Sequence, residues 1–284
     1  MEEAIRKADV LIEALPYIKE FHRRAMVIKY GGSILGEEKI RQGVLEDIVF
    51  LSYMGLCPVL VHGGGPNISD RMRSAGLKTE FVDGMRVTDE KTLEIVEEEL
   101  SKLNRLIVSE IQELGGKAIG FLGKKQDIIL ARKKQDNKDL GLVGEVESVN
   151  AKPLITQTKD YTICVICPMG KGADGRAYNI NADDVASSVA SSLSAEKLVV
   201  LTNVRGIMRC VDDPASLIST LTVQEARNLI KESAVQEGML PKVKSCIAAL
   251  ELGVKKTHII DARIPHALLL EIFTKQGVGT EIVK

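Results

Sequence analysis

Two stretches near the start of the chain, Val27-Ile-Lys-Tyr-Gly-Gly-Ser33 and Val59-Leu-Val-His-Gly-Gly-Gly-Pro66, decide the fold. Each is a short apolar run that stops at glycines, which is typical of a buried strand followed by a tight turn. A turn without side chains allows backbone N–H groups to approach a ligand. If the two strands are parallel neighbours, both turns lie at the carboxyl edge of one sheet, where open α/β sheets bind their ligands. The two stretches therefore predict an α/β protein with a binding site at this edge.

Strands and helices alternate along most of the chain, which predicts a mainly parallel sheet covered by helices on both faces. We expect helices at 3–22 (kinked or interrupted by Pro16), 38–54, 67–75, 90–114, 182–194, 223–232, 239–252 and 265–275. We expect strands at 25–30, 57–61, 161–167, 197–203, 257–261 and 279–283. Residues 118–150 are expected to form short strands and hairpins, and 169–175 a glycine-rich loop. The result would be one compact unit of two lobes that meet near residues 170–180.

The composition is that of an ordinary globular protein and excludes several classes of function. The 284 residues are 45% hydrophobic and 27% charged, with a formal net charge of −1. This balance gives no electrostatic footprint for nucleic acid or an anionic membrane. No apolar run approaches the roughly 18 residues of a membrane span, and the N-terminus does not resemble a secretory signal. We therefore expect no nucleic-acid partner and no membrane association.

The five cysteines favour reduced thiols in a cytoplasm-like compartment. Cys57, Cys164 and Cys167 lie in apolar, strand-like runs, and the total is odd. Cys164-Val-Ile-Cys167 matches the C-x-x-C pattern, but no second cysteine pair or histidine cluster accompanies it. Structural thiols are therefore favoured over a metal or redox site.

The two glycine turns suggest a cradle for anionic oxygens. Gly31 and Gly32 form the first turn, and Gly64 and Gly65 belong to the second. The alternative is that these glycines merely end their strands. Neither turn fits the G-x-x-x-x-G-K-[ST] pattern of a P-loop or the G-x-G-x-x-G pattern of a dinucleotide site.

Three cationic side chains are candidates for binding anions. Lys29 lies at the end of a strand that is expected to be buried, where a lysine is rare without a partner. Lys242 begins a helix, a position that the helix dipole disfavours for a cation unless an anion lies nearby. Arg86 precedes the long helix and serves either a surface ion pair or a substrate carboxylate.

Amides and carboxylates gather at the start of another helix, in Asn179-Ile-Asn-Ala-Asp-Asp184. Capping of the helix accounts for one of them, most simply Asn181. Asn179 and Asp183 are then left for other roles, and Asp183 is placed to hold lysines by charge pairing.

These residues together suit phosphoryl transfer to a carboxylate. The set contains two lysines, two glycine turns, an aspartate and an arginine, but no general base. The four histidines, His22, His62, His258 and His266, are scattered and show no metal-ligand spacing. A carboxylate acceptor is already ionised near neutral pH, so no proton has to be removed from it. What remains is to position two anions and to neutralise charge on the transferring group.

With these residues in place, the whole chain resembles the amino acid kinase family, and most closely its members that phosphorylate N-acetyl-L-glutamate in arginine biosynthesis. The resemblance rests on six motifs in order: Val27-Ile-Lys-Tyr-Gly-Gly-Ser33, Val61-His-Gly-Gly-Gly-Pro66, Gly84-Met-Arg-Val-Thr-Asp89, Tyr178-Asn-Ile-Asn-Ala-Asp183, Gly238-Met-Leu-Pro-Lys242 and Ile264-Pro-His-Ala-Leu-Leu-Leu-Glu271. Six ordered motifs make the match specific.

The resemblance implies an α/β fold, a three-layer αβα sandwich around an open, mainly parallel sheet of about eight strands. Residues 1–24 would form an oligomerisation helix and residues 25–284 the kinase domain. Its N-lobe (about 25–175) would hold N-acetyl-L-glutamate, and its C-lobe (about 176–284) would hold ATP with Mg²⁺. The enzyme would be cytoplasmic and would convert the γ-carboxylate to N-acetyl-L-glutamyl 5-phosphate, releasing ADP.

The resemblance also assigns roles residue by residue. Lys29 and Lys242 would stabilise the transition state, with Asp183 orienting both. The acceptor would be bound by Gly64, Gly65, Arg86 and Asn179. Gly31 and Gly32 would donate N–H groups to the moving phosphoryl group. No metal-ligating residue is implied.

Regulation by arginine is a further implication. The helix before Lys29 resembles one that interlaces dimers into a hexamer, a trimer of dimers, in arginine-inhibited members. His258, Glu271 and Gly277 match positions that bind the inhibitor there. Packing of the helix on its own subunit is the alternative. Some relatives also bind a nitrogen-sensing regulatory protein.

Several positions depart from the family pattern, and two other functions stay open. Asn203 replaces a usual Asp near the nucleotide pocket, Ala262 replaces a usual Gly near the arginine site, and residues 120–125 lack a common Ser-Gly-Lys-Asp form. One alternative is a sister kinase that acts on N-acetylaminoadipate, which is one methylene longer. The other is a non-catalytic amino-acid-binding regulator, against which the joint presence of both lysines and Asp183 argues.

Overall fold

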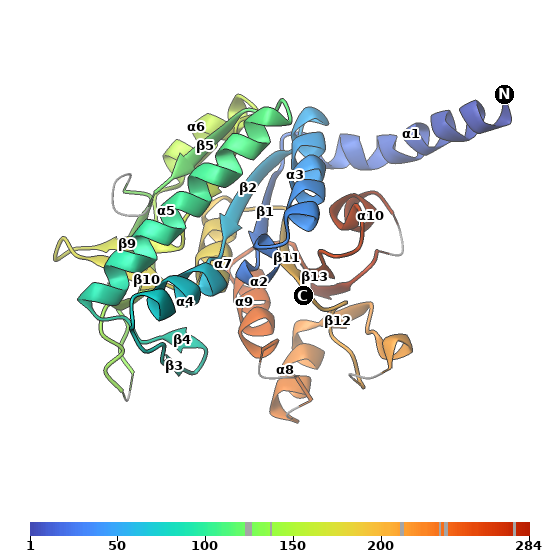
Figure 1. Ribbon diagram of the computed structural model, residues 1–284. Coiled ribbons are helices and arrows are strands. Elements are labelled where there is room, and N and C mark those ends of the chain that lie inside the picture. Colours follow the sequence, from blue (N-terminus) through green and yellow to red (C-terminus); the bar gives the residue numbers. More distant parts are fainter. Residues whose placement is uncertain (123–126, 137, 211–212, 233, 236–237, 275–276) are drawn as a thin grey trace.

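A computed structural model describes residues 1–122, 127–136, 138–210, 213–232, 234–235, 238–274 and 277–284. Its centre is an eight-stranded sheet (Figure 1). The strand order is β12 (Thr220–Thr222), β14 (Thr280–Val283), β13 (Lys256–Asp261), β11 (Lys197–Thr202), β1 (Ala25–Tyr30), β2 (Cys57–His62), β8 (Ile163–Ile166) and β5 (Ala118–Phe121). Neighbouring strands are parallel except β13 and β14. This confirms the expected open, mainly parallel sheet.

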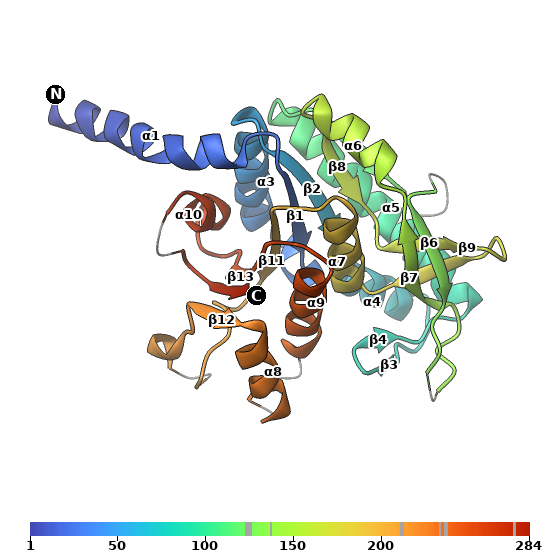
Figure 2. The ribbon, with the colours of Figure 1, turned by 180° about the vertical axis from the view of Figure 1, so that it is seen from behind.

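Helices cover both faces of this sheet because its strands are apolar on both sides. Val27 and Val59 pack in one core with α6 (Ala151–Lys159), α7 (Ala182–Ser192) and α9 (Leu240–Glu251). Their neighbours Ile28 and Leu60 pack in a second core with α3 (Glu38–Tyr53), α5 (Glu90–Glu113) and α10 (Ala267–Phe273). Figure 1 shows the α3 and α5 layer, and Figure 2 shows α7 and α9 on the opposite face. The three-layer αβα prediction is therefore confirmed.

A second, smaller sheet closes into a four-stranded barrel beside the main one and corrects one expectation. It consists of β6 (Ile129–Lys133), β7 (Val143–Val149), β9 (Met169–Gly172) and β10 (Ala177–Ile180). Residues 169–172, expected to belong to a loop, pair with β10 in an antiparallel hairpin. Gly170 packs so closely that a Cβ there would lie 2.7 Å from the Cβ of Ala131. Glycine is thus required by packing at this position, although it normally weakens a strand.

Short elements complete the carboxyl edge of the main sheet. They are α2 (Gly32–Leu35), α4 (Gly65–Ser74), β3 (Phe81–Val82) and β4 (Met85–Arg86). The C-terminal half also contains η2 (Pro214–Ser216) and α8 (Val223–Lys231), which begins with a capping box formed by Thr222 and Glu225. The side chain of Asn181 caps α7, as predicted. Within residues 120–125, the stretch that departs from the family pattern, residues 123–125 lie outside the described part of the chain.

The first helix, α1 (Glu2–Phe21), extends away from the rest of the molecule (Figures 1 and 2). Pro16 lies inside this helix and does not end it. Among its described side chains, contact with the body is made by the C-terminal part, where the ring of Tyr17 meets Phe273 edge-on with centroids 6.4 Å apart. Towards the N-terminus, Ile5 and Ile12 are exposed. Packing on its own subunit therefore accounts for the last turns of α1 alone.

Two findings bear on the cysteines and on membranes. All five cysteines are free thiols, four of them buried, as expected for reduced structural thiols. None of the helices in the described ranges is long and apolar enough to cross a membrane.

Candidate active site

The two glycine turns meet at the carboxyl edge of the sheet, as predicted. Strands β1 and β2 are parallel neighbours, with Lys29 opposite Val61. The turns that follow approach each other so closely that a Cβ on Gly32 would lie 2.9 Å from the backbone nitrogens of both Gly64 and Gly65. Any side chain at Gly32 would therefore push the turns apart, so glycine is required here.

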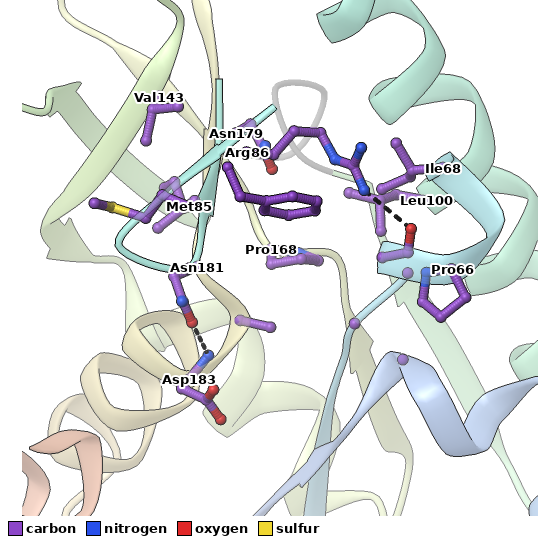
Figure 3. Close-up of a pocket in the computed structure, with 18 of the residues that line it drawn as sticks. Pro66, Ile68, Met85, Arg86, Leu100, Val143, Pro168, Asn179, Asn181 and Asp183 are labelled. Atoms are coloured by element: carbon purple, nitrogen blue, oxygen red, sulfur yellow. Dashed lines mark hydrogen bonds between the residues drawn. The ribbon is translucent and has the colours of Figure 1, made fainter. Parts of the chain in front are cut away.

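A cleft of about 290 Å³ opens at this edge (Figure 3). Its walls come from both turns, β4, β10 and the start of α7. The predicted site residues that line it are Lys29, Gly32, Gly64, Gly65, Arg86, Asn179 and Asp183. Gly31 does not line the cleft, and its N–H group donates to Leu201 O at 3.3 Å. Of the two glycines in the first turn, only Gly32 faces the cleft.

Three charged side chains from different elements meet at Asp183; Lys29 and Asp183 line the cleft, whereas Lys242 is not among its lining residues. Lys29 Nζ lies 2.9 Å from Asp183 Oδ1, and Lys242 Nζ lies 3.9 Å from Asp183 Oδ2. Lys29 comes from β1, Asp183 from the first turn of α7 and Lys242 from the first turn of α9. Two ammonium groups thus share one carboxylate, which leaves a positive charge that an anionic ligand would balance. Burial lowers the pKa of Lys242, and the Asp183 carboxylate opposes this shift.

A serine that reasoning from the sequence did not single out holds α7 and α9 together. Ser245 lies three residues after Lys242 and is buried. Its hydroxyl donates to the backbone carbonyl of Asp183 at 2.6 Å. This bond links the helix that carries Lys242 to the helix that carries its aspartate partner. A buried serine on a small-residue helix gives no distinctive sequence signal, which is why it was missed.

Arg86 is a buried cation on the opposite wall of the cleft. Its guanidinium group donates to Gly65 O at 3.0 Å and to Ser69 Oγ at 2.7 Å, and it lies 4.7 Å from the ring centroid of Phe81. Burial lowers the pKa of Arg86. No carboxylate of the described residues forms an ion pair with it. A buried guanidinium without an acidic partner is costly, so this geometry favours an anionic ligand over the surface ion pair.

Asn179 is connected to Arg86 through one threonine. The Asn179 amide donates from Nδ2 to Thr88 Oγ1 at 3.2 Å, and the Thr88 hydroxyl donates to Arg86 O at 2.7 Å. These bonds join the side chain of Asn179 to the backbone of Arg86 in a polar wall of the cleft. Apolar residues complete the lining: Ile68, Phe81, Met85, Leu100, Val143 and Pro168.

The three residues matched to the arginine site also lie together, away from this cleft. His258 Nδ1 lies 2.7 Å from Glu271 Oε1, and a Cβ on Gly277 would lie 2.8 Å from Glu271 Oε2. On its other side, His258 Nε2 lies 3.1 Å from Lys197 Nζ. Lys197 in turn lies 5.2 Å from the ring centroid of Phe21, the last residue of α1. The cluster is therefore adjacent to the place where α1 joins the body.

Resident metal chemistry finds no support among the described residues. They contain no group of three or more His, Cys, Asp or Glu side chains placed to hold a metal ion. Asp183, the carboxylate nearest the cleft base, already has two lysines as neighbours.

Comparisons with known proteins identify the family of this chain. A sequence model described as "Amino acid kinase family" matches residues 24–261. The chain is 50% identical over 283 residues to a protein named acetylglutamate kinase from Petrotoga mobilis, covering 99% of this chain and 95% of that one. It is 47% identical over 295 residues to a protein of the same name from Methanocaldococcus jannaschii, covering 100% and 98%.

Solved structures share the fold. The N-acetylglutamate synthase of Neisseria gonorrhoeae, complexed with coenzyme A and N-acetyl-glutamate, aligns with a TM-score of 0.87 at 28% identity, over 98% of this chain and 63% of its own. The carbamate kinase of Giardia lamblia bound to AMP-PNP aligns with a TM-score of 0.66 at 16% identity, over 92% and 99%. The second similarity shows the fold alone.

Proposed function

Because this chain belongs to the amino acid kinase family, we propose that it uses ATP to phosphorylate the side-chain carboxylate of N-acetyl-L-glutamate in arginine biosynthesis. The observation that carries the proposal is the cleft whose Asp183 is shared by Lys29 and Lys242, and in which buried Arg86 has no acidic partner among the described residues. Relatives named acetylglutamate kinase that are 47–50% identical over nearly the whole chain support the choice of acceptor.

The cleft is suited to an acceptor with two carboxylates and one small apolar group. Arg86 supplies a fork for one carboxylate, and Asn179 supplies an amide beside it. Met85, Val143 and Pro168 offer an apolar surface for an acetyl methyl group. The acetyl group itself has a chemical purpose, because a free amine would attack the new γ-acyl phosphate within the same molecule.

The proposed reaction needs no general base. An oxygen of the ionised γ-carboxylate attacks the γ-phosphorus of ATP, and the bond from that phosphorus to the bridging oxygen of ADP breaks. No proton is transferred, and the electron pair of the broken P–O bond leaves with ADP as negative charge on its terminal phosphate. Lys29 and Lys242 neutralise the charge on the transferring group, and Asp183 pairs with both ammonium groups. The N–H groups of Gly32, Gly64 and Gly65 provide further donors.

ATP and Mg²⁺ are implied by the family. Since the described residues form no metal cage, Mg²⁺ would arrive on the phosphates of ATP, where it neutralises part of their charge. We place the nucleotide in the C-lobe (about 176–284) and the acceptor in the N-lobe (about 25–175). A cavity of about 50 Å³ in the C-lobe, lined in part by Val204, Ile207 and Met239, is too small to hold a nucleotide, so this placement rests on the family alone. The exposed Asn203 lies next to it in the chain.

An acceptor comparison tests the function. Acyl phosphate formed from ATP would be trapped with hydroxylamine, using N-acetyl-L-glutamate, N-acetylaminoadipate and free glutamate in turn. We expect N-acetyl-L-glutamate to give the highest kcat/KM. A preference for N-acetylaminoadipate would assign the chain to the sister reaction. No ADP release with any acceptor would favour a non-catalytic amino-acid-binding regulator.

We also propose that arginine inhibits the enzyme and that α1 builds a homohexamer, a trimer of dimers. The projecting helix with exposed Ile5 and Ile12 supports an intermolecular role. The cluster of His258, Glu271 and Gly277 is adjacent to the end of α1, which would couple inhibitor binding to the helix. Free thiols suit a cytoplasmic location. Binding of a nitrogen-sensing regulatory protein stays a prediction.

Deletion of residues 1–22 is expected to yield dimers that arginine no longer inhibits, while activity without arginine is retained. The deletion removes the helix but leaves the cleft residues untouched. Molar mass by light scattering and activity over an arginine titration are the measurements. The substitution Ile12→Asp in the full-length chain is a control for the effect of truncation, and it should also abolish the hexamer. A truncated protein that is still hexameric, or still inhibited, would contradict this role of α1.

A further inference from the structure

One side chain beneath the glycine turn takes no part in the reaction described above. His62 is the last residue of β2 and is completely buried. We propose that His62 is a positioning residue that aims the N–H group of Gly64 into the cleft by holding the carbonyl group of Gly63. The inference rests on the proposed function, because it treats this cleft as the acceptor site.

The contacts of His62 fix the state of its ring. Its Nδ1 lies 3.0 Å from Gly63 O, and its Nε2 lies 3.2 Å from Asn104 Nδ2. A carbonyl oxygen can only accept, so Nδ1 must carry the hydrogen. Nε2 must then accept from the Asn104 amide. Burial lowers the pKa of His62 to about 4, so the ring stays neutral around pH 7.

The orientation of the Asn104 amide is fixed independently. Its Nδ2 also donates to Val165 O at 3.0 Å, so the nitrogen cannot exchange places with the oxygen. Its Oδ1 is buried and has no hydrogen-bond partner among the described residues. An unpaired buried oxygen is unfavourable. The Asn104 amide therefore makes both donor bonds while its oxygen stays unpaired. This is expected if the donor bonds, one of them to His62, position the His62 ring.

The contacts of the His62 side chain also reach residues next to other walls of the cleft. Cys167 Sγ lies 3.4 Å from His62 Nε2 and 3.5 Å from Leu100 O, to which its thiol can donate. Leu100 and Pro168, the neighbour of Cys167, both line the cleft. His62 thus joins β2 to α5 and to the end of β8 directly below the second glycine turn.

Because the peptide group is planar, a contact that holds the Gly63 carbonyl also sets the direction of the Gly64 N–H group. Gly63 O and the N–H of Gly64 belong to one peptide plane, and the described part of the chain contains no cis peptide bond. In a trans peptide the C=O and N–H groups point in opposite directions. When the His62 ring holds the carbonyl from below, the Gly64 N–H is turned to the other side, where the cleft lies. A glycine backbone has too much freedom to keep this orientation unaided.

Two substitutions of similar polarity separate positioning from packing. His62→Asn places an amide nitrogen near the position of Nδ1 and can still donate to Gly63 O. His62→Gln places its amide near Nε2, keeps a partner for Asn104 and leaves Gly63 O without this donor. We expect His62→Gln to lower kcat/KM for N-acetyl-L-glutamate by about 10- to 100-fold. The KM for ATP should stay unchanged, and His62→Asn should restore most of the lost kcat/KM.

Cys167→Ala is the matched control, since it removes one contact of the His62 side chain but leaves the bond from His62 to Gly63 O. It should behave like the unsubstituted protein. Equal kinetics for His62→Asn and His62→Gln, or a larger loss in His62→Asn, would overturn the proposal.

A measurement on the unsubstituted protein covers the case in which a variant does not fold, and it needs no substrate. The ¹⁵N chemical shifts of the His62 ring should show hydrogen on Nδ1 and none on Nε2 from pH 6 to 9. Hydrogen on Nε2 would overturn the proposal. Failure of the unsubstituted protein to phosphorylate any acceptor would instead refute the proposed function, so the two failures are distinguishable.

Discussion

Replacing Lys29 with alanine is expected to lower kcat by about 100-fold or more, the scale of a lost electrostatic contact to a transition state. The Lys29 ammonium group is buried at the base of the cleft, 2.9 Å from Asp183 and next to the first glycine turn. In Lys29→Ala, only one of the two proposed lysines would remain to neutralise the transferring phosphoryl group. No other described cation could take the place of Lys29 on β1. ADP release at saturating ATP and N-acetyl-L-glutamate is the measurement.

The controls for Lys29→Ala separate chemistry from folding. The exposed Lys39 lies on α3, nearby in the sequence, and Lys39→Ala should leave kcat unchanged. Asp183 keeps Lys242 as a partner at 3.9 Å, so the variant should fold, and its thermal unfolding should be recorded alongside. Turnover close to that of the unsubstituted protein would reject the role of Lys29.

Replacing Lys242, the lysine of the C-lobe, with alanine should also lower kcat by about 100-fold or more. Lys242 lies at the start of α9, where the helix dipole opposes a cation, and burial further lowers its pKa. A lysine held against both effects by Asp183 is placed for an anion that arrives during the reaction. The measurement is the same kinetic assay, extended to the KM for each substrate.

The same helix supplies a matched control. Lys244 is exposed two residues further along α9, and Lys244→Ala changes the net charge by the same amount. It should leave kcat and both KM values unchanged. If the two substitutions had equal effects, the loss would reflect general charge or helix stability, and the assignment of Lys242 would fail.

The central part of the fold was predictable because its physical causes are local. Apolar runs such as 57–62 end at glycines, and helices begin at caps such as Asn181. Alternation of these elements leaves few arrangements other than a covered parallel sheet. The convergence of Lys29 and Asp183 followed from the same reasoning, because both lie at carboxyl ends of strands or at the helix starts that follow them.

What could not be predicted depends on contacts between distant segments. Helix α6 was missed, since Pro153 and the β-branched Ile155, Thr156 and Thr158 give it weak helical propensity, and packing on the sheet stabilises it instead. The strand at 169–172 was missed because its glycines are explained only by the neighbours against which they pack. The ring around His62 joins residues up to 105 positions apart, and no spacing in the sequence reveals it.

The claim on which the account depends is that ammonium groups from the two lobes act on one transferring phosphoryl group. A crystal structure with a non-hydrolysable ATP analogue, Mg²⁺ and N-acetyl-L-glutamate tests it most directly. The account predicts that Lys29 Nζ and Lys242 Nζ both lie within hydrogen-bond distance of oxygens on the γ-phosphoryl group, with the acceptor carboxylate in line on its far side. A complex in which either nitrogen points to solvent, or in which the acceptor lies outside the cleft of Arg86 and Asn179, would contradict it.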